Sequence, residues 1–164
     1  MKKGENKKGF TIIEVVLVLG IAGLIFLMMM IALPALRRTQ ADSQRKDDIA
    51  RLLSAIKNYQ TNNRGALPTE PIQINELETK YLPDNFTDPD GEKYVLVVEN
   101  CDKTGTSGNC KQTEKLENSV FPNGHQMYVM VGATCGDTLP KKAANNRKVA
   151  VAYKLEAGVF CNNT

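Results

Sequence analysis

The stretch Lys7-Lys8-Gly9-Phe10-Thr11-Ile12-Ile13-Glu14 opens a long apolar segment that extends to Leu33. Of the 24 positions from Phe10 to Leu33, only Thr11 and Glu14 are neither apolar nor glycine. About 20 helical residues cross the hydrocarbon core of a bilayer, so the segment predicts a transmembrane helix. Glu14 is the exception, because a carboxylate in such a segment costs roughly 2.5–3.5 kcal/mol on insertion scales and needs a partner.

The residues before the apolar segment are basic. Residues 1–9 contain four lysines and one glutamate, a net charge of +3. Lysines beside an apolar segment hold that end in the cytoplasm. The segment is too long for the core of a secretory signal, and no small-x-small cleavage pattern follows it. Any cleavage is therefore expected on the cytoplasmic side, where it would leave a free amine close in sequence to Glu14.

Gly9, Phe10, Thr11 and Glu14, followed by a long apolar helix, resemble the class III signal of type IV pilins and pseudopilins. In that family a membrane-embedded aspartyl peptidase cuts after the glycine and methylates the new N-terminal residue, and the apolar helices then pack into a filament core. The resemblance implies cleavage after Gly9 and N-methylation of Phe10. It also implies that Glu14 pairs with the terminal amine of a neighbouring subunit during assembly. The implied partners are other pilin subunits, the prepilin peptidase, and the inner-membrane assembly platform with its ATPase.

The pairing of Glu14 with an amine also has a physical rationale. Opposite charges attract strongly in a medium of low dielectric constant, and each charge relieves the desolvation of the other. Such a pair would set the register of subunit addition. The alternative is a chance polar residue near the interface that reaches toward the headgroups.

Outside the leader the chain carries no net charge. Its 164 residues fit one modest domain beside the membrane segment. Without residues 1–9, the counts of basic and acidic residues are 17 and 17. This balance does not indicate a nucleic-acid-binding surface, although a local basic patch is left open.

The N-terminal helix is expected to continue beyond the membrane. Residues 10–36 form its apolar half, in which Pro34 is expected to kink or locally melt the backbone. Residues 37–64 then predict an amphipathic half, which Asn62-Asn63-Arg64-Gly65 would end. The apolar residues with helical spacing are Leu36, Ile49, Leu52, Leu53, Ile56 and Tyr59.

Residues 65–164 predict a C-terminal globular domain. A short helix is expected over Ile74–Tyr81, followed by β-strands at three runs rich in branched and apolar residues. These runs are Tyr94–Glu99, Gln126–Val131 and Lys148–Leu155. Their lengths suit a small antiparallel sheet with the amphipathic helix laid across it, which is an α+β, pilin-like architecture.

All four cysteines follow the membrane segment, in the part that would be exported. An even count in a small extracytoplasmic domain indicates two disulfides, for which three pairings exist. We favour Cys101–Cys110, which would close the loop over residues 102–109, and Cys135–Cys161, which would resemble the C-terminal disulfide loop of many pilins. A zinc site is disfavoured because the chain has no Cys-x-x-Cys spacing and a single histidine, His125.

No catalytic constellation and no cofactor motif is recognised, so an enzyme is not expected. Thr87-Asp88-Pro89-Asp90-Gly91 predicts a turn. With Glu92, its carboxylates could bind calcium, as loops nearby do in some pseudopilins, but the spacing is not that of a calcium loop. Turn chemistry alone accounts for these residues, and no metal site is assigned.

These features favour a structural subunit. It would be stored as a single-pass cytoplasmic membrane protein, processed, and polymerised into an extracellular pilus filament that serves adhesion, twitching motility or DNA uptake. Two alternatives remain open. One is a minor pilin or a pseudopilin of type II secretion or competence. The other is a membrane-anchored exported domain that does not polymerise.

Overall fold

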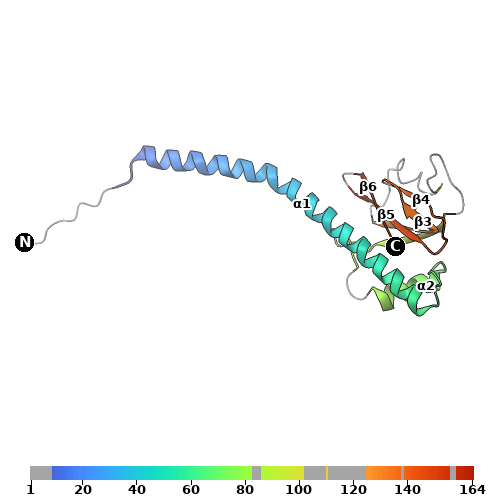
Figure 1. Cartoon of the computed structure of the whole chain (residues 1–164). Helices are drawn as coiled ribbons and strands as arrows, with labels where there is room; N and C mark the ends of the chain where they lie inside the picture. The colour runs from blue at the N-terminus through green and yellow to red at the C-terminus, as the bar shows by residue number, and fades with distance from the viewer. Residues whose placement is uncertain (1–8, 83–85, 102–109, 111–124, 138, 156–157) are drawn as a thin grey trace, which may run out of the picture. The chain divides into compact units, whose positions relative to one another are not determined.

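The computed structural model describes residues 9–82, 86–101, 110, 125–137, 139–155 and 158–164 (Figure 1). The chain divides into two compact units, residues 1–40 and 41–164. Apart from Gly9, the predicted leader lies outside the described residues, as does the loop predicted over residues 102–109.

The first element is a single long helix, α1 (Ile12–Asn62), with Pro34 inside it. The helix is continuous through Pro34, so the local melting expected at this residue is absent. The predicted stop after Asn62 is confirmed. Arg64 and Gly65 adopt positive φ values of 55° and 86°, and the Gly65 N–H donates to the Gln60 carbonyl at 2.7 Å. This is a left-handed helix ending of the kind that glycine favours.

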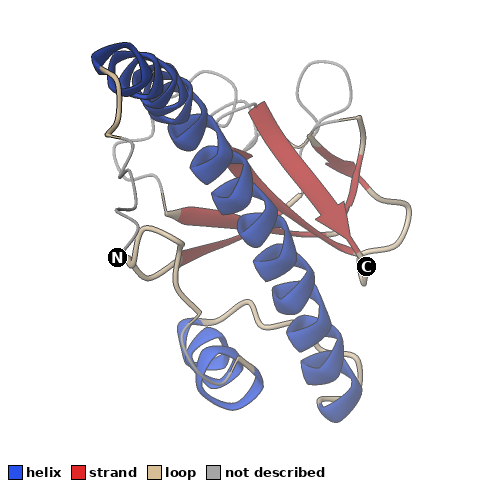
Figure 2. Ribbon diagram, turned by 90° about the vertical axis from the view of Figure 1, so that its left-hand side faces the viewer, coloured by secondary structure: helices blue, strands red, loops and turns tan. Residues whose placement is uncertain are grey.

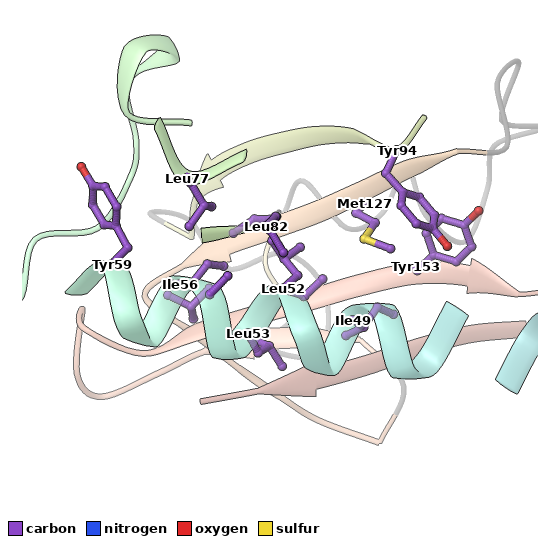
Figure 3. Close-up of a cluster of buried hydrophobic side chains, with 14 of the residues drawn as sticks. Ile49, Leu52, Leu53, Ile56, Tyr59, Leu77, Leu82, Tyr94, Met127 and Tyr153 are labelled. Carbon is purple, nitrogen blue, oxygen red and sulfur yellow. The ribbon is translucent and has the colours of Figure 1, made fainter. Parts of the chain in front are cut away.

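Within the second unit, residues 41–62 of α1 lie across one face of a β-sheet (Figure 2). Ile49, Leu52 and Ile56 are fully buried, and they point from the helix toward the strands (Figure 3). Their spacing of three and four residues places them on one face of the helix. Leu36, which the sequence placed in the same row, is exposed instead.

The main sheet has four strands in the order β1-β2-β5-β6. Their bounds are β1 (Val95–Asn100), β2 (Gln126–Val131), β5 (Val149–Leu155) and β6 (Gly158–Asn163). β2 and β5 are antiparallel, as are β5 and β6. β1 runs parallel to β2, with Val95 opposite Gln126 and Asn100 opposite Val131.

The parallel pair corrects the expectation of an antiparallel sheet, because the observed sheet is mixed. A parallel neighbour needs a connection of a dozen residues or more. The 25 residues between Asn100 and Gln126 are long enough to carry the chain back to the starting end of β1. The coarser α+β class stands.

The two faces of the sheet carry different side chains because successive strand residues point to opposite sides. Val149, Val151 and Tyr153 of β5 face α1, whereas Ala150 and Ala152 face away from it. On that far face, a hairpin of β3 (Ala133–Cys135) and β4 (Pro140–Lys142) packs against the sheet together with both cystines.

A short helical segment completes the domain. It consists of α2 (Pro71–Glu76) followed by a π-helical turn, η1 (Leu77–Tyr81). The helix expected over Ile74–Tyr81 therefore exists but begins earlier, at Pro71, where proline is favoured in a first turn. Leu77 is buried in the hydrophobic core between α1 and the sheet (Figure 3).

Candidate functional site

The N-terminal site is built around the first turn of α1. Thr11 immediately precedes the helix, and Glu14 is the third helical residue. The Thr11 N–H donates to Glu14 Oε2 at 3.0 Å, and the Thr11 hydroxyl donates to the same oxygen at 2.9 Å. A glutamate that binds the backbone N–H of the residue before the helix is half of a capping box. Glu14 is thus held at the start of the helix by its own chain.

The apolar residues behind Glu14 are exposed on every side of the helix. Phe10 is 90% exposed and Phe26 is 73% exposed. Of the described residues, one helix, α1, is long and apolar enough to cross a membrane. A helix that is apolar all round must be covered by lipid or by other apolar helices.

A shallow hollow lies beside the Glu14 carboxylate. It measures about 430 Å³ and is lined by Phe10, Glu14, Val15, Val18 and Leu19. The lining is apolar except for the single carboxylate. A cationic group placed there would meet Glu14, and lipid or other apolar helices around the hollow would reduce screening of the pair by water.

A second polar group lies in the globular domain. It consists of Arg45, Asp88, Asp90, His125 and Tyr153, which we call the Asp88 cluster. Arg45 donates to both Asp88 oxygens, from Nε and Nη2, each at 2.9 Å, and its Nη2 also lies 3.0 Å from Asp90 Oδ2. The Tyr153 hydroxyl donates to Asp88 Oδ2 at 2.9 Å, and the Asp90 N–H donates to Asp88 Oδ1 at 3.1 Å. The cluster ties the loop after Phe86 to α1 and β5.

Asp88 and Arg45 stay ionised although the Asp88 side chain is fully buried. Burial alone would raise the pKa of Asp88, but hydrogen bonds from Arg45, the Asp90 backbone and Tyr153 outweigh it and lower the pKa to about 2. The hydrogen bond to Asp88 raises the pKa of Arg45. Burial, together with the hydrogen bond to Asp88, raises the pKa of Tyr153. All three groups therefore stay in one protonation state near neutral pH.

Asp48 on α1 forms a similar arrangement beside the Asp88 cluster. It is 3% exposed, accepts from Arg51 at 3.0 Å and accepts from the Tyr94 hydroxyl at 3.1 Å. Burial and the charge of Asp48 raise the pKa of Tyr94. The rings of Tyr94 and Tyr153 meet edge to face at 5.8 Å, which joins the two arrangements.

The predicted turn at residues 87–91 is present, and the calcium alternative can be tested against its geometry. Ligand atoms of Asp88, Asp90 and His125 lie within 4.8 Å of one another. His125 Nδ1 is buried, lies 3.8 Å from Asp88 Oδ2, and has no hydrogen-bond partner in the described part of the chain. However, the Arg45 guanidinium already binds both carboxylates. It supplies the positive charge that a metal ion would otherwise bring, so this geometry favours a lock between loop and helix over a metal centre.

The four cysteines pair as the sequence analysis favoured. Cys101 is bonded to Cys110, and Cys135 is bonded to Cys161. Gly9 and Phe10 lie just before α1, and Glu14 lies in its first turn. The structure adds the Asp88 cluster, which the sequence analysis missed. A usable signal was present, because Arg45 and Asp48 occupy positions of α1 on the same face as Ile49 and Leu52, where a charge requires a buried partner.

Comparisons of the chain with protein-family profiles, with curated proteins and with solved structures found no match in any of the three.

Proposed function

We propose that this chain is a type IV pilin-like structural subunit, cleaved after Gly9 and polymerised through residues 10–36 into a surface filament. One observation carries the proposal. The apolar part of α1 is exposed all round, and a single capped carboxylate lies at its start.

The exposed apolar surface supports two successive environments for the helix. In the membrane, lipid chains cover it. In a filament, the same helices of other subunits would replace the lipid. Because lipid tails are as apolar as leucine, helices gain little from this exchange by hydrophobic burial alone. Close packing and polar pairs must therefore supply the preference for the filament.

Glu14 is suited to supply such a polar pair. While the subunit is stored, the N–H and hydroxyl of Thr11 satisfy part of the hydrogen-bonding capacity of the carboxylate. Cleavage between Gly9 and Phe10 would create a cationic amine on every mature subunit. The amine of one subunit, placed in the apolar hollow beside Glu14 of the next, would neutralise the carboxylate and fix the register.

The globular domain is consistent with export in this scheme. Two disulfides in a small domain are typical of oxidising compartments outside the cytoplasm. The domain would be carried on the filament by α1, to which it is joined covalently.

Intact-mass and N-terminal analysis of the native protein tests the processing step. We expect a chain that begins at Phe10, carries a methyl group on its amine, and lacks four cysteine hydrogens. A mature protein that still begins at Met1 would count decisively against the proposal.

The assembly step is tested by Glu14→Gln, which preserves shape and removes the charge. Sheared surface filaments should fall roughly 100-fold or more, because breaking a buried pair by removing one partner costs about 3–5 kcal/mol. Processing should continue. Glu78→Gln, at an exposed site on η1, is the matched control and should assemble normally. Normal filament yield from Glu14→Gln would contradict the proposed role of the carboxylate.

A further inference from the structure

Two arginines follow the apolar segment directly. Arg37 and Arg38 come after Leu36 in α1, and both are exposed. In residues 10–36, Glu14 is the only charged side chain. The arginine pair therefore marks the distal end of the segment as sharply as Lys7 and Lys8 mark its beginning.

The length of the segment places this pair at a defined depth. The 25 residues from Ile12 to Leu36 rise about 37 Å, at roughly 1.5 Å per residue. A bilayer has a hydrocarbon core of about 30 Å and measures about 40–45 Å with its headgroup layers. A centred helix therefore extends about 4 Å beyond the core on each side. Arg37 and Arg38 then lie in the headgroup layer and not in the water beyond it.

The chemistry of arginine fits the phosphates at that depth. A guanidinium group binds a phosphate through two parallel N–H donors, and it is less strongly hydrated than an ammonium group. Consecutive helical residues point about 100° apart, so the two side chains can reach different lipids. Basic residues on the extracytoplasmic side also oppose the usual charge bias of membrane proteins. An anionic ligand there offsets that disadvantage.

We propose that Arg37 and Arg38 bind the phosphate groups of anionic phospholipids in the extracytoplasmic leaflet and thereby fix the depth of the helix in the bilayer. Glu14 lies 23 residues before Arg37, a rise of about 35 Å. Fixing the arginine end places Glu14 at the opposite boundary of the core and the Gly9–Phe10 bond outside it, within reach of a peptidase. The inference rests on the membrane-stored state of the proposed function and not on polymerisation.

The lack of tryptophan in the chain permits a direct test. Leu36→Trp, next to the pair, is placed in the full-length protein and reconstituted in phosphatidylcholine vesicles that contain a minor fraction of phosphatidylglycerol. Bromine is carried by one lipid or the other, and quenching of tryptophan fluorescence reports which lipid is adjacent. We expect phosphatidylglycerol to be enriched about fivefold per arginine, since each basic residue near an anionic surface contributes on the order of 1 kcal/mol.

The decisive variant adds R37Q/R38Q to the Leu36→Trp protein and should abolish the preference. The matched control, K57Q/R64Q, removes two exposed positive charges from the second unit and should retain it. Equal quenching by both lipids in the parent, or a preference that survives R37Q/R38Q, would overturn the proposal. Loss of the preference on addition of inorganic phosphate, but not of chloride at equal ionic strength, would support recognition of the phosphate group, because free phosphate would then compete with the lipid for the arginines.

Depth is measured separately with Phe26→Trp, near the middle of the segment. Lipids brominated at different depths should quench this residue most strongly near the bilayer centre, and R37Q/R38Q should broaden or shift the profile. An unchanged profile would refute the depth-fixing role. Glu14→Gln should leave both lipid measurements unchanged, so failure of this inference can be distinguished from failure of the filament proposal.

Discussion

The two halves of α1 handle charge in opposite ways. In residues 41–62, Arg45 and Asp48 lie on the buried face, and donors or acceptors from distant parts of the same chain satisfy both of them. In the apolar half, the donors that reach Glu14 belong to Thr11, three residues earlier. The comparison teaches that the charges on the buried face of α1 are paired within one chain, whereas the described residues bring only the Thr11 donors to Glu14. In the proposed filament, the cation for Glu14 would come from a neighbouring subunit.

The largest effect on the domain is expected from Arg45→Ala. This change leaves Asp88 buried without its cation, and we expect the free energy of unfolding to fall by about 3–5 kcal/mol. Urea unfolding of the full-length protein in detergent measures it. Lys57→Ala, which removes an exposed cation from the same helix, should change the value by less than about 0.5 kcal/mol. Glu14→Gln should leave it unchanged, and a comparable loss there would break the comparison.

The disulfides should rank by the length of chain that they close. Removing a disulfide typically costs about 2–4 kcal/mol, and the cost grows with loop length. Cys135–Cys161 spans 26 residues and Cys101–Cys110 spans 9. The variant C135S/C161S should therefore be less stable than C101S/C110S by about 1 kcal/mol. Urea unfolding under non-reducing conditions measures the stability of both variants. The reverse ranking would contradict the loop-closure argument.

The last effect concerns acid. The pKa of Asp88 is about 2 in the folded domain, and about 3.9 is usual for an unfolded chain. A lowered pKa stabilises the fold above the unfolded value, and this contribution is lost as pH falls from about 4 toward 2. It amounts to about 2–3 kcal/mol. Unfolding measured from about pH 5 down to 2 should show the parent and Asp88→Asn converging. If the difference in free energy of unfolding between the two proteins stayed constant with pH, the Asp88 charge would not be the source of the stabilisation.

The sequence predicted the elements with continuous apolar patterns. Gln126–Val131 was assigned without error, because a run of apolar residues bounded by a turn is a strong strand signal. β6, an edge strand, was missed because Gly158 and two asparagines form its ends and leave only three apolar residues between them. β3 and β4 were missed because each has only three residues, two of them lysines in β4.

The pairing of distant residues could not be predicted. The parallel pairing of β1 and β2 depends on how a 25-residue connection returns, which local pattern does not encode. Arg45 and Asp88 are 43 residues apart, and the sequence analysis did not pair them, because no local pattern links residues at that separation. The N-terminal site could be proposed from the sequence alone because its residues are close together in the chain.

The order of residues in the Asp88 cluster also constrains when the domain can fold. Asp88 receives Arg45 from the beginning of the domain and Tyr153 from near its end, 65 residues after itself. β5, which carries Tyr153, lies between β2 and β6 in the sheet. Domain folding must therefore wait until almost the whole chain is available. A chain truncated before Tyr153 would leave the buried face of residues 41–62 uncovered and accessible to proteases.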